Sequence, residues 1–472
     1  MDEEQLSRLV QAEEQMDLLE LEDAKKSVLL WGRYFMPHRF TTETQSSLHY
    51  YLDDKLSAME AADVAGPREW AKSTLAAVVA PTMWTCEVEK YGRRFITICC
   101  NTLGLANDWL KEIQTEFEQN ELILEHYGNL RGSPWREGYL AFNNGVHIRA
   151  THLRGRVRGW MRMGFRPQVI VCDDLEDYQD VVTEKRREKN WQWFHTALMG
   201  GAANDCVFFC IGNLIHQHMI LAKRIKQNRG ESFKALDAHD QSTWEEHKPT
   251  AVLHKRREEM GEAFFNQEFM GMPLTAGQLA AFLDAMLHDF SPFTRADIGQ
   301  FKEIWVGIDL AKSLTDDADF TAFAMVGIRG PEDLEEYHIL DLFREKIAIP
   351  NHLDALKDWI GQDKITGYVV ESIGFQEELA ADIEDWLDET QQHDVYVHRY
   401  TPKDPKERRL YRMLKACGGA KRLKIANIPL AETWVEQAKT IDDPDEHDDL
   451  VDPVTSIHAS LAPARLRMRM TG

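Results

Sequence analysis

Lys72 and Ser73 end a segment with the spacing of a phosphate-binding loop, G-x-x-x-x-G-K-[ST]. Gly66 matches the first glycine, but Ala71 replaces the second. In such a loop the backbone N–H groups point at the phosphates, the lysine reaches the outer phosphates and the hydroxyl holds Mg²⁺. We expect the alanine, which adds one methyl group, to be tolerated if its φ is negative. So short a pattern also arises by chance, and a nucleotide site needs a second motif.

The second motif is QVIVCDDLED, residues 168–177, in which an apolar run leads to Asp173 and Asp174 and then to Glu176 and Asp177. Phosphate-loop ATPases hold the nucleotide's Mg²⁺ through a carboxylate at the end of a buried strand, and Asp173 has that position. The alternative is a solvated helix start, because acidic residues favour the first turn of a helix. The two motifs together are far more specific than either one, and they predict an ATP site.

Other polar residues near these motifs could act on a nucleotide. Gly212 and Asn213 end the run FFCIGN, and they predict either an amide near the γ-phosphate or an ordinary turn. Arg68, inside the loop, could stabilise charge on the leaving phosphate or cap a surface turn. An arginine- and glycine-rich segment between the motifs suits a phosphate backbone, a neighbouring subunit's nucleotide or the acidic N-terminal helices of the same chain. Its arginines are Arg154, Arg156, Arg158, Arg162 and Arg166.

A separate set of carboxylates lies in the last third of the chain. Asp309 ends the apolar run of VGIDLAKS, Glu371 ends that of YVVESIG, and Asp448, Asp449 and Asp452 begin a helix. The spacing of Asp449 and Asp452 predicts that both face the same side of that helix. Such carboxylates are what a two-metal phosphodiester nuclease requires, since hard oxygen ligands bind Mg²⁺ or Mn²⁺. Each residue alone is also explained by capping, whereas their common order favours a metal site.

The formal net charge of −23 makes the chain a poor candidate for coating nucleic acid non-specifically. A DNA contact would therefore come from a local basic patch. The best candidate is the run from 399 to 424, RYTPKDPKERRLYRMLKACGGAKRLK, in which Tyr400 and Tyr411 are interleaved with basic residues. The alternative for this run is a solvated basic helix.

Two α/β regions are expected to position these residues. Apolar runs at 93–100, 167–174 and 205–213 alternate with helical stretches, which predicts a parallel sheet covered on both faces. A second region begins with the run 303–311, and the two apolar runs after it suggest a meander. The expected organisation is a helical segment over 1–60, a P-loop ATPase core over 61–215, a small helical subdomain or linker over 216–300 and a mixed α/β domain over 301–472.

Composition excludes several protein classes. Apolar residues make up 43% of the chain and charged residues 28%, which is ordinary for a globular protein. No apolar run reaches about 18 residues, so we expect no membrane span. The acidic N-terminus lacks the features of a signal peptide and indicates a cytoplasmic protein. Seven cysteines without a C-x-x-C pair indicate reduced thiols and not a zinc site or a disulfide framework.

An ATPase followed by an RNase H-like nuclease in one chain resembles the large terminase subunit of tailed bacteriophages. The resemblance covers about residues 30–460 and rests on PREWAKST, RGRVRGWMRMGFRPQVIVCDDLED, GIDLAKS, VVES and HDDLVDP. It implies an ASCE-type ATPase domain with a parallel sheet, followed by an RNase H-like nuclease domain. It also implies a motor that uses ATP to translocate double-stranded DNA through a portal into the procapsid. The nuclease would cut concatemeric DNA at initiation and termination.

The resemblance implies roles for single residues as well. Lys72 and Ser73 would bind ATP and its Mg²⁺ with support from Thr74, and Arg68 would act on the γ-phosphate. Asp173 would hold Mg²⁺ through water. The family's catalytic glutamate usually follows that aspartate directly, and here the position is Asp174, so Glu176 is a second candidate for the base. Gly212 and Asn213 match the coupling motif. The nuclease triad of Asp309, Glu371 and Asp449 would hold two Mg²⁺ or Mn²⁺, with Asp452 or Asp448 as an extra ligand.

The implied partners are double-stranded DNA, the portal protein and the small terminase subunit, in the cytoplasm of the host bacterium. The subunits would form a ring on the portal, a pentamer, although such subunits also occur as monomers. One alternative is a DNA repair or recombination ATPase fused to a nuclease, which would share both chemistries without binding a portal. Another is a non-enzymatic adaptor whose acidic clusters only solvate it. Packaging strategy and cutting specificity stay open.

Overall fold

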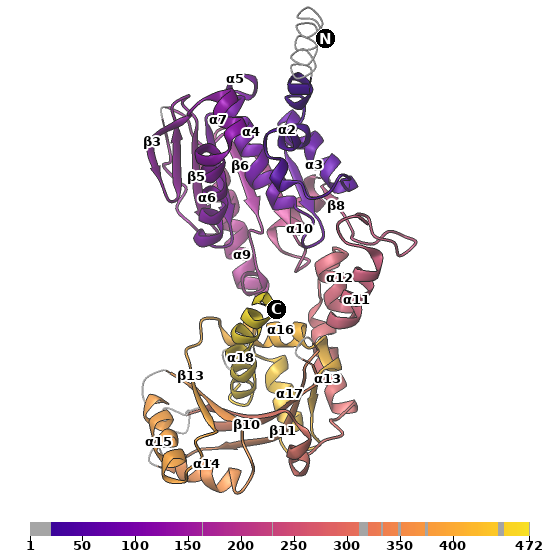
Figure 1. The fold of residues 1–472 in the computed structure, drawn as a ribbon, viewed down its shortest axis with the longest axis vertical. Helices are drawn as coiled ribbons and strands as arrows, with labels where there is room; N and C mark the ends of the chain where they lie inside the picture. Colours follow the sequence, from indigo (N-terminus) through magenta and orange to yellow (C-terminus); the bar gives the residue numbers. More distant parts are fainter. Residues whose placement is uncertain are drawn as a thin grey trace, which may run out of the picture. The chain divides into compact units, whose positions relative to one another are not determined.

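The structure is a computed structural model that describes residues 20–162, 164–228, 230–310, 320–331, 334–347, 351–372, 376–441 and 448–471 (Figure 1). The first 19 residues of the expected N-terminal helices, and parts of the GIDLAKS and DEHDDLVDP segments, lie outside these ranges. The chain divides into two compact units. The first comprises residues up to 254 and 266–273, and the second comprises 255–265 and the residues from 274 onward. The stretch 216–300, expected to form a separate helical linker, therefore contributes to both units.

An eight-stranded sheet of described residues forms the centre of the first unit, in the order β3-β4-β5-β2-β6-β7-β1-β8. Each strand in the part β5-β2-β6-β7-β1-β8 of this order pairs in parallel with its neighbour. The strands β3 and β4 add an antiparallel edge beside β5. The predicted parallel sheet is confirmed. The bounds are β1 Ala62–Ala65, β2 Phe95–Cys100, β3 Arg131–Arg136, β4 Tyr139–Phe142, β5 His147–His152, β6 Val169–Asp173, β7 Val207–Gly212 and β8 Glu231–Ser232.

The central strands β2, β6 and β7 are buried along their whole length. Successive side chains of a strand point to opposite faces of the sheet. Val169 and Val171 accordingly belong to one core cluster, with residues of α2, α3, α4 and α6, whereas Ile170 and Cys172 belong to another, with residues of η3 and α10. Helices thus cover both faces, which explains why these strands are continuous apolar runs and do not alternate with polar residues.

The first unit contains the helical stretches predicted between the apolar runs, together with short helices that the sequence did not predict, such as α5, α7 and α8. The predicted helix after the phosphate loop is a π-helical segment, η2, followed by α4. The bounds are α2 Val28–Phe35, η1 Pro37–Arg39, α3 Ser47–Ala58, η2 Thr74–Val79, α4 Ala80–Cys86, α5 Val88–Tyr91, α6 Leu103–Gln119, α7 Glu121–Tyr127, α8 Tyr178–Val181, α9 Glu184–Trp193, η3 Phe194–Met199 and α10 Ile220–Asn228. Helices α11 Thr250–Met260 and α12 Glu262–Phe269 contribute residues to both units.

The second unit contains a six-stranded sheet of described residues in the order β13-β12-β9-β10-β11-β14. Strands β9, β10 and β11 are antiparallel neighbours, so the predicted meander is confirmed, and β12 pairs in parallel with β9. The strand bounds are β9 Glu303–Asp309, β10 Thr321–Arg329, β11 Glu336–Glu345, β12 Gly367–Glu371, β13 Tyr396–Tyr400 and β14 Leu423–Ile425. The helix bounds are α13 Ala276–His288, η4 Arg295–Gln300, α14 His352–Ile360, α15 Gln376–Glu389, α16 Lys406–Ala416, η6 Gly419–Lys421, α17 Ala431–Lys439 and α18 Val451–Thr471.

Gly307 on β9 allows the first turn of α18 to approach the sheet closely. A Cβ at this position would lie 2.1 Å from the carbonyl oxygen of Pro453. No side chain fits in that space, so glycine is required. The contact brings the beginning of α18, with Asp452, to the strand that ends in Asp309.

Candidate functional sites

The phosphate-loop lysine is buried in the first unit and points back into its own loop. Lys72 Nζ donates to the carbonyl oxygen of Pro67 at 2.6 Å and to Asn213 Oδ1 at 3.1 Å. Burial lowers the pKa of Lys72, and the nearby carboxylates of Asp174 and Asp173 oppose that shift. The loop follows β1 and Asn213 follows β7, which is paired in parallel with β1, so the predicted residues meet at the carboxyl edge of the sheet.

Ser73 and Asp173, the two predicted magnesium residues, are in direct contact. Ser73 Oγ donates to Asp173 Oδ1 at 2.7 Å. Burial, with a contribution from the charge of Asp174, raises the pKa of Asp173 to about 7. A buried carboxylate beside a hydroxyl suits Mg²⁺, whose positive charge would offset this cost. Thr74, predicted to support Lys72 and Ser73, begins η2 directly after Ser73.

Ala71 does not meet the condition under which we expect alanine to be tolerated at this position, a negative φ. Its φ is +49°, in the left-handed region that favours glycine. The second glycine of the pattern therefore has a conformational role here, and alanine occupies the position at a cost of about 1 kcal/mol. Gly66 has a steric role instead, because a Cβ there would lie 2.2 Å from Leu48 Cδ1 and 3.0 Å from Lys72 Cδ.

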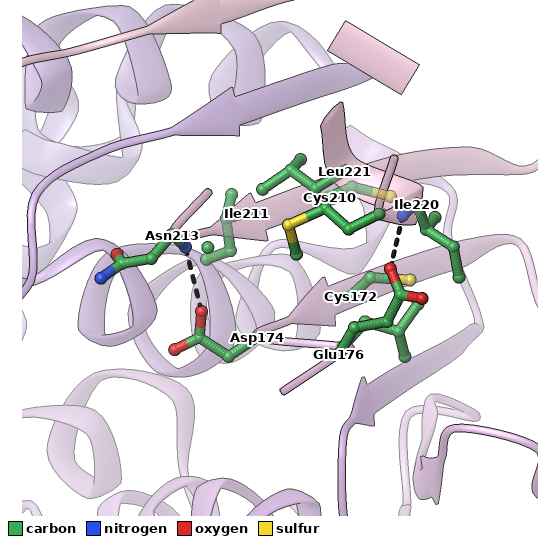
Figure 2. Close-up of a pocket in the computed structure, with 11 residues that line it drawn as sticks. Cys172, Asp174, Glu176, Cys210, Ile211, Asn213, Ile220 and Leu221 are labelled. Atoms are coloured by element: carbon green, nitrogen blue, oxygen red, sulfur yellow. Dashed lines mark hydrogen bonds between the residues drawn. The ribbon is translucent and has the colours of Figure 1, made fainter. Parts of the chain in front are cut away.

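Asp174 and Glu176, the two candidates for the catalytic base, point in different directions (Figure 2). Asp174 Oδ1 accepts a hydrogen bond from the backbone N–H of Asn213 at 3.2 Å. The side-chain oxygen of the same Asn213 accepts from Lys72. Its φ of +42° is strained for a non-glycine residue. Gly212 leaves room for it, since a Cβ there would lie 2.7 Å from Asp174 Oδ1.

Glu176 is instead a buried anchor between two helices. It accepts from Asn190 Nδ2 on α9 at 3.0 Å and from the backbone N–H of Ile220 at the start of α10. Burial raises its pKa to about 7. Of the two carboxylates, only Asp174 is among the charges that act on Lys72. The geometry therefore favours Asp174 as the base.

Arg68 pairs with Glu268, a residue that the sequence analysis did not single out. Arg68 Nη1 lies 3.1 Å from Glu268 Oε2, and the Arg68 backbone N–H donates to the Glu268 carbonyl at 2.9 Å. The Arg68 side chain is 59% exposed, whereas that of Glu268 is 6% exposed. A single acidic residue in the helical segment FNQEF carries no sequence signal for this contact, because α12 is far from the loop along the chain.

Residues 154–158 of the arginine-rich segment line a surface cavity in the first unit, together with Lys189 and Trp193 of α9. Arg154 pairs with Asp180 at 2.7 Å, and Arg158 donates to the carbonyl of Thr196 at 3.0 and 3.1 Å. These contacts go to α8 and η3, and residues 1–19 of the N-terminal helices, to which one alternative pairs this segment, lie outside the described residues.

The predicted nuclease carboxylates come together in the second unit. We call Asp309, Glu371, Asp449 and Asp452 the carboxylate cluster. Asp309 ends β9 and Glu371 ends the parallel neighbour β12. Burial raises the pKa of Asp309 well above its usual range, and the charges of the other three residues raise it further.

The placement of Asp449 differs in one respect from the prediction. Helix α18 begins at Val451, so Asp449 lies in the turn before it and does not share a helical face with Asp452. Asp449, in the turn before α18, and Asp452, in the first turn of the helix, both lie near enough to Asp309 for their charges to raise its pKa. Asp448, the other predicted candidate, forms an ion pair with Lys406.

Two arginines neutralise part of the carboxylate cluster, and neither was predicted from the sequence to belong to it. Arg409 of α16 donates from Nη1 to Glu371 Oε1 at 3.1 Å and from Nη2 to Asp452 Oδ1 at 2.6 Å. Arg344 of β11 donates from Nε and Nη2 to Asp449 Oδ2, at 3.2 and 3.0 Å. Arg409 belongs to the basic run predicted to hold DNA, but its side chain is 5% exposed. Tyr411 also belongs to this basic run, but its side chain is buried and packs on Phe264.

The donors of the carboxylate cluster are those that Mg²⁺ and Mn²⁺ prefer. Like charges so close together also call for a cation. In the described ranges no three His, Cys, Asp or Glu side chains are arranged to hold a metal ion. The oxygens of Glu371, Asp452 and Asp449 are bound by guanidinium groups instead. The carboxylate oxygens suit a hard divalent cation, and in the structure Arg344 and Arg409 bind them.

No protein-family model and no curated protein matches the chain. Among solved structures, the large terminase of a thermophilic bacteriophage is 10% identical over 81% of this chain and 86% of its own, with a TM-score of 0.48. The HK97 bacteriophage large terminase is 11% identical over 84% and 90%, with a TM-score of 0.31. The chain is similar to large terminases. The human cytomegalovirus terminase nuclease domain, Mn soaked, is 14% identical over 37% of this chain and 93% of its own, with a TM-score of 0.27.

The roles of individual residues rest on the contacts within this chain. Over the part of the chain described, no helix combines the length and the apolar character needed to cross a membrane.

Proposed function

We propose that this chain is the large subunit of a phage DNA-packaging motor, which hydrolyses ATP to translocate double-stranded DNA and cuts DNA with a metal-dependent nuclease. The observation that carries the proposal is the contact between Ser73 and Asp173 beside the buried Lys72. The same chain holds a second cluster of carboxylates at the ends of adjacent strands. Each feature has a separate chemistry, and a packaging motor needs both.

In the ATPase unit, Lys72 would exchange its bonds to Pro67 and Asn213 for bonds to the outer phosphates of ATP. Ser73 and Asp173 would hold the Mg²⁺ that neutralises those phosphates. Asp174 would orient the attacking water and accept its proton, a role that its position beside Asn213 supports. Arg68 would release Glu268 and stabilise the charge that develops on the γ-phosphate.

In the nuclease unit, Asp309, Glu371 and Asp449 would hold two Mg²⁺ or Mn²⁺, with Asp452 as a further ligand. Such cations, when bound, activate water and stabilise the leaving oxygen of a phosphodiester. The protein's part is to hold oxygen donors from two strand ends, a turn and a helix in one place, with Asp449 buried and the other three partly buried. Limited access of water strengthens their interaction with cations.

The proposed partners follow from the motor function. Double-stranded DNA would be the substrate of both units, and the portal protein would anchor a ring of subunits, a pentamer. The small terminase subunit would select the DNA, in the cytoplasm of the host bacterium. Binding to a portal separates this function from that of a repair ATPase fused to a nuclease, so a pull-down with a portal ring distinguishes them.

Paired point variants test the proposal. Lys72→Ala should abolish DNA-stimulated ATP hydrolysis and leave Mn²⁺-dependent cutting of plasmid DNA, and Asp309→Asn should do the reverse. Each variant is the control for the folding of the other unit. Full ATPase activity in Lys72→Ala would contradict the motor assignment, and full cutting by Asp309→Asn would contradict the nuclease assignment.

A further inference from the structure

We propose that Arg409 is the cation that the carboxylate cluster holds in the metal-free protein, and that a divalent cation must displace it to bind. This inference rests on the proposed nuclease function, because it concerns the metal site of that function. Arg409 would then set the metal affinity of the site and stabilise the protein while the site holds no metal.

The position of the guanidinium supports this role. Arg409 is buried, and its two terminal nitrogens bridge Glu371 on β12 and Asp452 on α18. Its charge also acts on Asp309, the third member of the cluster. The planar group therefore occupies the space among carboxylates that arrive from three different elements. The oxygens it binds, Glu371 Oε1 and Asp452 Oδ1, would be ligands of the metal.

The hydrogen bonding of Arg409 is incomplete at one nitrogen, unlike that of the Arg344 nitrogens that face Asp449. The Nε of Arg409 is buried and has no hydrogen-bond partner among the described residues. An unsatisfied buried donor raises the free energy of the arginine-bound state. Arg344, by contrast, uses both Nε and Nη2 on Asp449 and stacks on the ring of Phe320, 3.8 Å from its centroid. Of the two arginines, Arg409 is the one that lies between carboxylates of different elements and keeps an unpaired donor there.

The charges of the site indicate that a divalent cation replaces the Arg409 guanidinium and does not bind in addition to it. A guanidinium beside the metal ligands repels an incoming cation, so metal binding with Arg409 in place would be weakened. Losing the arginine without a replacement would leave buried carboxylates unpaired, which is costly. A divalent cation satisfies both conditions, since it brings more charge than the guanidinium removes.

The test is Mn²⁺ binding to the full chain, measured by isothermal titration calorimetry or from the electron paramagnetic resonance signal of free Mn²⁺. Arg409→Gln should bind Mn²⁺ about tenfold more tightly than the wild type and unfold at a lower temperature without metal. Arg409→Lys should lie between them, because lysine cannot bridge two carboxylates with a planar fork. Arg412→Gln is the matched control, since Arg412 lies on the same helix, is 52% exposed and pairs with Asp404 outside the cluster.

The outcomes separate the inference from the proposed function. A wild type that binds no Mn²⁺ would overturn both, because there would be no metal site. A wild type that binds Mn²⁺ with an affinity that Arg409→Gln and Arg409→Lys leave unchanged or weaken would overturn the inference alone. If neither variant folds, amide hydrogen exchange of residues 406–416 in the wild type decides the matter. Exchange should rise when Mn²⁺ is added, and unchanged or slower exchange would overturn the inference.

Discussion

The Ser73 hydroxyl donates a 2.7 Å hydrogen bond to Asp173, a residue 100 positions further along the chain. The contact joins the end of the phosphate loop to the end of β6, although β7 lies between β6 and β1 in the sheet. It exists because the carboxyl ends of parallel strands meet at one edge, where loops from distant parts of the sequence converge. The residues around this contact and around the carboxylate cluster are open to direct tests by substitution.

Asp174→Asn should reduce the rate constant of ATP hydrolysis by at least about 100-fold, because an amide cannot take the proton of the attacking water. Glu176→Gln should keep that rate constant within about threefold of the wild type, since Glu176 contacts Asn190 and Ile220 and not the lysine. Steady-state ATPase assays at saturating ATP measure both. The opposite ranking of the two variants would make Glu176 the base.

The stability of the ATPase unit should fall as the pH rises from about 4.5 to 7. Burial raises the pKa of Glu176 from its ordinary value to about 7, so the folded state binds the proton more strongly than the unfolded state. The stabilisation is therefore complete below the unfolded pKa and is lost as the pH rises through the folded value, by up to about 3 kcal/mol. Asp173 is shifted in the same direction.

Urea unfolding followed by tryptophan fluorescence at pH 5, 6, 7 and 8 measures this dependence. Glu176→Gln should flatten it, because glutamine does not titrate. The variant should also be less stable at pH 5, since the glutamine amide group would face a donor from either Asn190 or Ile220. A pH dependence identical in the variant and the wild type would rule out the titration of Glu176 as its source.

Ala71→Gly should stabilise the nucleotide-free protein by about 0.5 kcal/mol. Glycine removes the cost of a left-handed alanine, and its greater freedom in the unfolded chain offsets part of that gain. Ala71→Val should destabilise the protein by at least about 1 kcal/mol, because a β-branched side chain is more strained at φ +49°. Thermal unfolding measures both changes, and a glycine variant less stable than the wild type would contradict the assigned conformation.

Gly307→Ala should destabilise the nuclease unit by at least about 2 kcal/mol and weaken Mn²⁺ binding. The added methyl group has no room beside Pro453 and would push α18, which carries Asp452, away from β9. Gly299→Ala is the control, because a Cβ at that position meets nothing within 4 Å. Differential scanning calorimetry and Mn²⁺ titration compare the two, and equal behaviour would show that the close approach is unimportant.

The apolar runs and their terminal carboxylates were predictable because they are local patterns. β6, β7, β9 and β12 all appear in the sequence as apolar stretches followed by Asp, Glu or Gly. β1 was missed because it has only four residues and includes Asp63, whose charge is neutralised by Arg224 from α10. A pairing between residues so far apart has no signature in the strand itself.

The partners of the site residues were not predictable for the same reason. Glu268 and Arg344 lie on α12 and β11, in segments without a catalytic pattern, and only the fold brings them to Arg68 and Asp449. The φ of Ala71 was not predictable, because residue type alone does not reveal that the loop requires a left-handed turn at this position. Arg409 was noticed as part of a basic run, but a count of charges cannot tell a buried arginine from a solvated one.

The division of helices α11 and α12 between the units bears on how the protein can be cut into working fragments. A fragment that begins at residue 301 would lose Phe264, whose ring centroid lies 5.7 Å from that of Tyr411, and Phe282, which stacks on Phe264. It would also lose the carbonyl of Glu259 that receives Arg422 Nη1 at 2.6 Å. Tyr411 of α16, the helix that carries Arg409, and the guanidinium of Arg422 would then lose these partners. A nuclease fragment should therefore begin near residue 255, even though it would then carry along residues 266–273 of the other unit.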